Sequence, residues 1–213
     1  LGEVVTQAAR DAPPTDVGAP FPLVLFSHGK GGIRMQSTFY TVFLASHGYI
    51  VVSPDHEGDT LPELLEEMAI DPVSTLDAYV DRQADMIFLM DRWAALPGSD
   101  ALHGLTDMTR VGITGHSFGA LTSMKVAGID NRIDAVVAHT PATYLLVQAD
   151  IPTPLREYGI PIMLQSAQLD ETLPPDPHTT SNWENMAAPR YLMNLKTGGH
   201  FTYSDLCVLD LEQ

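Results

Sequence analysis

Six short apolar runs that alternate with helix-like segments constrain the fold of this chain more than any other feature. The runs span residues 21–27, 49–53, 111–114, 133–138, 160–165 and 191–195. The first five are nearly continuous in apolar residues, which is typical of strands buried on both faces of a parallel sheet. The sixth is less clear-cut and is expected nearer an edge. The alternation predicts an α/β fold with a mostly parallel central sheet and helices on both faces.

Helical spacing is found between these runs, at 37–47, 78–96 and 182–188. In the second stretch the apolar residues at helical spacing are Val80, Ala84, Ile87, Phe88, Met90 and Ala94. Two longer connections, 56–77 and 140–158, follow predicted strands. Ligands bind at the carboxyl ends of strands in open α/β sheets, so both connections are candidates for lining a cleft, with ordinary surface connections as the alternative. A length of 213 residues fits a single domain, residues 1–213.

Charge and apolar content exclude several classes of partner. The chain has 27 acidic and 11 basic residues, a formal net charge of −16, which repels nucleic-acid phosphates. No apolar run approaches the roughly 20 residues that span a bilayer. No signal peptide is visible, but the chain begins with Leu1, so we expect an upstream segment to have been removed. A secreted or periplasmic location is favoured, with the cytoplasm as the alternative, and the oligomeric state is open.

A Gly-x-Ser-x-Gly sequence follows the third apolar run, at Gly115-His116-Ser117-Phe118-Gly119. The residues after it, 120–127, have apolar positions on one side of a helix. A strand that turns directly into a helix at such a sequence forms a nucleophile elbow. The tight turn strains the serine backbone and needs tiny residues two positions before and after it. The context predicts that Ser117 is a nucleophile whose hydroxyl stands clear of the sheet, with a plain strand–helix turn as the alternative.

A serine nucleophile needs a general base, and the base needs a carboxylate that orients it. In folds with this elbow the acid and then the histidine follow the serine along the chain. Asp170 follows the fifth apolar run and His200 follows the sixth. The spacing lets both side chains reach the edge of the sheet that carries Ser117. The sequence therefore predicts the catalytic set Ser117, Asp170 and His200.

Other acids and histidines fit this order less well. Glu171 ranks second to Asp170 as the candidate acid, because as its neighbour in the sequence it would point elsewhere. Asp150 has no strand before it. Five other histidines are assigned to the elbow, to the core or surface, or to positions that break the order: His47, His103, His116, His139 and His178.

An oxyanion hole is expected where the loop after the first run meets the elbow. The loop, His28-Gly29-Lys30-Gly31-Gly32, is rich in small residues whose N–H groups can turn toward an anion. One donor is predicted to be the N–H of Phe118, and the other the N–H of Lys30 or Gly31. A glycine-rich turn without chemical importance is the alternative.

Metal and cofactor sites are not expected. The single cysteine, Cys207, excludes an intrachain disulfide and a multi-thiolate metal site. Asp55-His56-Glu57 has ligand residue types, but three consecutive residues on a regular element cannot all face one ion. Neither Gly-x-Gly-x-x-Gly nor a Walker sequence is present, which argues against a phosphate-binding loop.

Four sequence motifs together resemble the α/β-hydrolase superfamily: residues 22–29, residues 44–49, the Gly115–Gly119 elbow and Gly199-His200. They are similar to its dienelactone-hydrolase-like branch, which includes platelet-activating-factor acetylhydrolase relatives and polyester hydrolases. Dienelactone hydrolase itself uses a cysteine, where this chain has Ser117. In the plasma acetylhydrolases the acid follows the strand after the elbow helix, where this chain has His139-Thr140, so the resemblance to polyester hydrolases selects Asp170.

The family normally has one or two strands before the first motif and a full helix after the histidine. Here 27 residues precede His28 and 13 follow His200, so we expect a chain trimmed at both ends. The resemblance implies a serine carboxylic-ester hydrolase for small to medium acyl esters, without a cofactor. Phospholipid acetylhydrolase and polyester hydrolase are alternatives within the branch. A peptidase or amidase is a further alternative among enzymes, since the same triad cuts amides. A non-catalytic ligand-binding protein is the alternative of another class.

Overall fold

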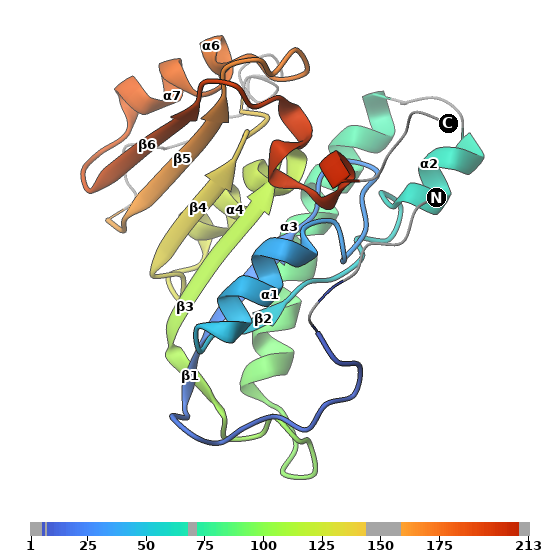
Figure 1. The fold of residues 1–213 in the computed structure, drawn as a ribbon, viewed down its shortest axis with the longest axis vertical. Helices are drawn as coiled ribbons and strands as arrows, with labels where there is room; N and C mark the ends of the chain where they lie inside the picture. The colour runs from blue at the N-terminus through green and yellow to red at the C-terminus, as the bar shows by residue number, and fades with distance from the viewer. Residues whose placement is uncertain (1–5, 7, 68–71, 144–158, 209–213) are drawn as a thin grey trace.

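A computed structural model describes residues 6, 8–67, 72–143 and 159–208, which form one sheet of six strands with helices around it (Figure 1). The strands are β1 (Phe21–Ser27), β2 (Ile50–Val52), β3 (Thr106–His116), β4 (Ala135–His139), β5 (Ile162–Ala167) and β6 (Arg190–Leu195). Their order is β2-β1-β3-β4-β5-β6, and every neighbouring pair is parallel. All six apolar runs are strands, which confirms the predicted α/β sheet.

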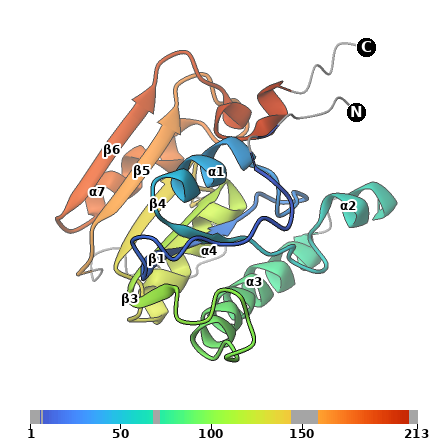
Figure 2. The same ribbon diagram turned by 60° about the horizontal axis from the view of Figure 1, so that its bottom comes forward.

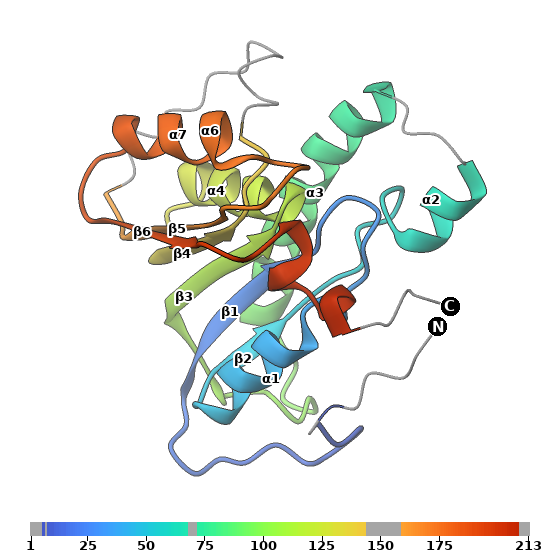
Figure 3. The ribbon, with the colours of Figure 1, turned by 45° about the horizontal axis from the view of Figure 1, so that its top comes forward.

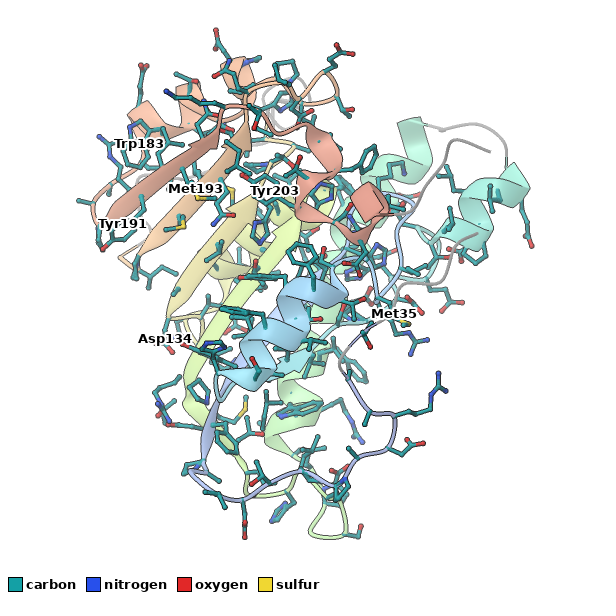
Figure 4. The ribbon with its side chains drawn as sticks, viewed as in Figure 1. Met35, Asp134, Trp183, Tyr191, Met193 and Tyr203 are labelled. Carbon is teal, nitrogen blue, oxygen red and sulfur yellow. The ribbon has the colours of Figure 1, made fainter. Side chains whose placement is uncertain are left out.

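The sixth run is an edge strand, as the sequence predicts. β6 pairs only with β5 in the sheet order. Its apolar side chains stay in contact with solvent, and Tyr191 and Met193 are 53% and 37% exposed (Figure 4). A strand with one free edge buries fewer side chains than a central strand, so its sequence carries a weaker apolar signal.

Helices cover both faces of the sheet. They are α1 (Thr38–Ser46), α2 (Leu61–Glu67), α3 (Pro72–Ala94), α4 (Phe118–Ile129), α6 (Pro175–His178) and α7 (Thr180–Asn185), followed by the 3₁₀ turns η1 (His200–Tyr203) and η2 (Asp205–Val208). α1 lies on one face, and α3, α4, α6 and α7 lie on the other (Figure 3). α2 lies at the periphery (Figure 2). In the part of the chain that the structure describes, no helix is long and apolar enough to cross a membrane.

The buried side of α3 shares Met90 and the partly buried Ile87 with the apolar stripe expected from the sequence, and differs from it elsewhere. Val80 and Phe88 are 62% and 61% exposed. The buried side instead runs through Tyr79, Arg82, Met86 and Met90. Their spacing of three or four residues is helical, but one member is an arginine, so hydropathy alone misplaces the stripe. α3 also begins at Pro72, before the expected 78, and proline is well tolerated at the first helical position.

The core lies between the sheet and the α3–α4 layer. Leu25 of β1, Ile113 of β3 and Leu164 of β5 are each at most 1% exposed, and they pack with Met86 of α3 and Met124 of α4. This packing fixes β3 and α4 on either side of the elbow. The predicted connection 56–77 contains α2 and the start of α3, whereas most of the connection 140–158 lies outside the described residues.

Candidate active site

Ser117 occupies a strained turn between β3 and α4. Its φ is 56° and its ψ is −116°, a region that residues other than glycine rarely adopt. The turn is held by the Ser117 N–H, which donates to the carbonyl oxygen of His139 at 2.9 Å. The Ser117 carbonyl in turn accepts from the N–H groups of Ala120 and Leu121 in the first turn of α4. The backbone therefore places Ser117 at the carboxyl end of a central strand.

The two glycines of the elbow are required by close packing. A Cβ atom on Gly119 would lie 2.0 Å from the carbonyl oxygen of Ser27, and one on Gly115 would lie 2.5 Å from the backbone of Gly119. Both contacts are with backbone atoms, which cannot rotate away. The end of β1 and the start of α4 can approach the elbow only because these residues lack side chains.

Asp170 and His200 form a hydrogen-bonded pair. Asp170 follows β5, His200 follows β6, and the Asp170 Oδ2 to His200 Nδ1 distance is 2.7 Å. The other oxygen, Oδ1, accepts from the N–H groups of Thr172 and Leu173 at 2.9 and 2.7 Å. Burial by itself would raise the pKa of Asp170, but the hydrogen bonds from His200 and these N–H groups hold that pKa below its usual value. The carboxylate can therefore stay ionised while it is buried.

The position of Ser117 relative to His200 is set through His116. Both Ser117 and His200 lie in the described chain, and no hydrogen bond joins their side chains. The His116 ring lies 4.7 Å, centroid to centroid, from the His200 ring, and its Nε2 donates to the His200 carbonyl oxygen at 2.8 Å. Burial lowers the pKa of His116 to about 3, so this ring is neutral. His116 is a spacer between the elbow and the histidine turn.

Gln36 links this spacer to the loop after β1. Its Nε2 donates to His116 Nδ1 at 2.7 Å, and its Oε1 accepts from the Gly29 N–H at 2.6 Å. Sequence reasoning missed Gln36, because it lies 80 positions from His116 and belongs to no motif. The nearby glycines are the one available signal, since they mark a loop that approaches another backbone closely.

The turn that carries His200 is anchored on the start of α1 and the end of β5. Asp205 accepts from the N–H groups of Thr38 and Phe39, and its own N–H donates to the Gln36 carbonyl oxygen. The Tyr203 hydroxyl donates to the Ser166 carbonyl oxygen at 3.0 Å (Figure 4). A carboxylate at a helix N-terminus satisfies N–H groups that have no partner within the helix.

Three of the loop N–H groups are already occupied. Gly29 donates to Gln36, Gly32 donates to the Gly29 carbonyl oxygen, and Gly31 donates to Asp59 Oδ1 at 3.0 Å. Among the described residues, the N–H groups of Lys30 and Phe118 have no hydrogen-bond acceptor. Of the two loop donors that the sequence left open, Lys30 is therefore the one that is available.

The competing residues have other surroundings. Glu171 is exposed, His139 is bound between Thr114 and Gln165, and Asp150 lies outside the described residues. The side chains of residues 55–57 do not form a shared site, because both ring nitrogens of His56 bond to other residues, Ser27 and Asp85. Within the described ranges, no group of three or more His, Cys, Asp or Glu side chains is arranged to hold a metal ion.

The amino-acid sequence is similar to that of known ester hydrolases. The sequence model of the family described as platelet-activating factor acetylhydrolase, isoform II, matches residues 1–61. A platelet-activating factor acetylhydrolase of Cavia porcellus is 24% identical over an alignment of 189 residues. The match covers 67% of this chain and 40% of that protein. The enzyme of the same name from Canis lupus familiaris is 39% identical over 56 residues, 26% of this chain and 12% of that protein.

A solved structure extends the similarity to nearly the whole chain. The ferulic acid esterase of Streptomyces cinnamoneus superposes with a TM-score of 0.73 and 26% identity, covering 96% of this chain and 58% of the esterase. The chain thus spans about two fifths of the length of the Cavia porcellus acetylhydrolase and under two thirds of the length of the esterase. Its parallel sheet, its strained elbow and these matches together show that the chain belongs to the α/β-hydrolase superfamily.

Proposed function

We propose that this chain is a serine carboxylic-ester hydrolase that acts through an acyl-enzyme. Ser117 attacks the ester carbonyl carbon, and His200 takes the hydroxyl proton and passes it to the leaving alcohol. Asp170 orients His200 and stabilises the imidazolium. Water then attacks the acyl-enzyme with His200 as the base, which releases the acid and regenerates Ser117.

The observation that carries the proposal is the buried Asp170–His200 pair at the same sheet edge as a strained serine. An ionised Asp170 favours the imidazolium that forms when His200 accepts a proton. The free N–H groups of Lys30 and Phe118 would donate to the negative oxygen of the tetrahedral intermediate. The relatives named above, which are acetylhydrolases and an esterase, support the same reaction class.

A buried apolar cluster packs beside the elbow. It contains Tyr79 of α3, Phe118 and Leu121 of α4, and Ala142 after β4, with Leu173 after β5 packed against it. These side chains come from four segments that meet near Ser117. We propose esters with small to medium acyl chains as substrates, which the similarity to acetylhydrolases and an esterase supports, with acetylated phospholipids and polyesters as narrower alternatives within the branch.

Active-site labelling tests the proposal. A fluorophosphonate probe should label the wild-type chain on Ser117, as mapped by peptide mass spectrometry. The chain should also hydrolyse p-nitrophenyl acetate and butyrate. Ser117→Ala should abolish both labelling and turnover, because no other hydroxyl lies in the elbow.

The matched control is Ser27→Ala, which removes a buried serine that also bonds to a histidine. This variant should be labelled like the wild type. Labelling that persists in Ser117→Ala would refute the assignment. A wild-type chain that is folded but neither labelled nor active would favour a ligand-binding protein without catalysis.

A further inference from the structure

Lys30, whose N–H is the loop donor proposed above, lies between two peptide units. The Gly29–Lys30 unit contains this N–H and the Gly29 carbonyl oxygen. The Lys30–Gly31 unit follows it and contains the Gly31 N–H. Because a peptide unit is planar and trans, its carbonyl and N–H point in opposite directions. The direction of the Lys30 N–H is therefore set by whatever holds the Gly29 carbonyl.

The Gly29 carbonyl oxygen of the first unit accepts from the Gly32 N–H at 3.0 Å and from His28 Nδ1 at 2.7 Å, and Arg82 of α3 adds a third donor. Its Nη2 donates to the Gly29 carbonyl oxygen at 3.0 Å, and its Nη1 donates to the His28 carbonyl oxygen at 2.6 Å. The side chain is 1% exposed, although arginine is a residue that proteins rarely bury. Its planar fork can bind two successive carbonyls, which an ammonium group cannot do in the same way.

Asp59 holds the second unit and completes the arrangement. Its Oδ1 accepts from the Gly31 N–H at 3.0 Å, while its Oδ2 accepts from Nε and Nη2 of Arg82 at 2.8 Å each. The Asp59 side chain is 3% exposed. One buried ion pair thus contacts the peptide units on both sides of Lys30, and its arginine joins the Gly32 N–H and His28 in holding the first of them.

The same arginine also contacts the second proposed donor. The guanidinium carbon of Arg82 lies 5.0 Å from the centroid of the Phe118 ring, within the range of a cation–π contact. Phe118 supplies the other free N–H, so a single side chain on α3 lies against both segments of the proposed oxyanion hole. α3 reaches the loop after β1 along the face of the sheet that α4 also covers (Figure 3).

We propose that Arg82 and Asp59 are positioning residues of the oxyanion hole, which fix the direction of the Lys30 N–H by holding the peptide units on either side of it. Neither side chain touches the substrate in this scheme, and the inference rests on the proposed function. Burial lowers the pKa of Arg82 to about 10 against the opposing charge of Asp59, so the guanidinium stays charged at neutral pH. A buried ion pair is a poor way to gain stability alone, and its role in positioning accounts for its presence.

Paired ester substrates separate positioning from simple structural support. A thionoester has sulfur in place of the carbonyl oxygen, and sulfur is a weak hydrogen-bond acceptor that gains little from an oxyanion hole. Arg82→Lys keeps the charge but loses the fork, and Asp59→Asn keeps the shape but loses the charge. In either variant kcat for the oxygen ester should fall about 100-fold with KM unchanged. The ratio of oxygen-ester to thionoester kcat should fall with it.

Ser27→Ala is the matched control, since Ser27 lies within 3.4 Å of Arg82 Nη1 but holds neither loop carbonyl. It should leave the substrate ratio unchanged. Each variant is checked by circular dichroism, and if Arg82→Lys does not fold, Asp59→Asn is interpreted by the same criteria. Folded variants with unchanged kcat, or with equal losses for both esters, would overturn the inference. Failure of the proposed function would be seen separately, as a wild-type chain that hydrolyses neither ester.

Discussion

Two Ser–His–Asp groups are found among the residues that the structure describes, and their hydrogen bonds resemble each other more than their surroundings do. In one, Ser27 donates to His56 Nε2 at 2.9 Å, and His56 Nδ1 donates to Asp85 at 2.7 Å. In the other, His200 Nδ1 donates to Asp170 at the same 2.7 Å, and Ser117 stands on the elbow. By hydrogen bonds alone the first group is the more complete of the two.

Burial and charge reverse that ranking. Ser27 is fully buried within β1, so a substrate cannot reach its hydroxyl. Burial lowers the pKa of His56 to about 2, with the nearby charge of Arg82 acting in the same direction. A general base must become an imidazolium, which His56 cannot do at neutral pH. Access of the substrate and the stability of the charged histidine, rather than hydrogen bonds alone, therefore distinguish a catalytic group.

Removing the acid of each group should give the largest contrast. Asp170→Asn should lower kcat about 10⁴-fold, by analogy with the same change in a serine protease, because the histidine loses its orienting carboxylate. Asp85→Asn should leave kcat unchanged, since His56 takes no part in catalysis. Ester hydrolysis by both purified variants measures the difference. If Glu171→Gln is more damaging than Asp170→Asn, the acid has been assigned wrongly.

Adding a methyl group where the two groups meet should affect both of them. Gly119 of the elbow lies against the carbonyl oxygen of Ser27, so the Cβ of Gly119→Ala would contact it at 2.0 Å. We expect a loss of about 3 kcal/mol in the free energy of unfolding, measured by urea denaturation, as for other overpacked sites. Gly98→Ala, where no atom lies within 4 Å of the new Cβ, is the control and should lose no stability.

The smallest contrast is in the pH dependence of stability. Because the folded pKa of His56 is about 2, the unfolded chain binds a proton below pH 6.5 that the folded chain does not. Stability should therefore fall as the pH falls through this range, by about 1.4 kcal/mol per pH unit for this residue. Measured by urea denaturation between pH 7 and 5, the slope for His56→Gln should be shallower by about 1 kcal/mol per pH unit on average, because the full value is reached only well below pH 6.5.

The exposed His103 provides the control for this measurement. His103→Gln should leave the slope of the wild-type chain in place, because its ring is not buried. An equal slope in His56→Gln and the wild type would show that His56 accepts a proton in the folded state, and the contrast between the two groups would then be lost.

Much of the fold could be predicted because local patterns of apolar residues in the sequence indicate its strands. Apolar runs predict strands wherever both faces of a sheet are covered, and all six were found. Helix α2 was missed although a signal was present. Thr60 and Glu63 form hydrogen bonds typical of a helix start, and the spacing of Thr-x-x-Glu could have indicated it.

The supporting residues of the site could not be predicted in this way. Ser117, Asp170 and His200 follow strands in a fixed order, so motif and sequence order suffice to nominate them. Gln36 bonds to His116, which is 80 positions away, and Arg82 bonds to Gly29, which is 53 positions away. No local pattern indicates that a buried arginine in an amphipathic helix will bind two loop carbonyls. Only the packing of α3 against the loop after β1 reveals it.

The hydrogen bonds of Gln36 have a consequence for how the site opens. Its side-chain amide bonds to Gly29 of the loop after β1 and to the elbow histidine, and its backbone carbonyl accepts from the Asp205 N–H, so segments distant along the chain meet at one residue. Such a junction cannot release one segment while the others keep their full set of contacts. We expect the amide hydrogens of Gly29 and Asp205 to exchange with solvent at a common rate, as one cooperative unit, rather than as two independent loops.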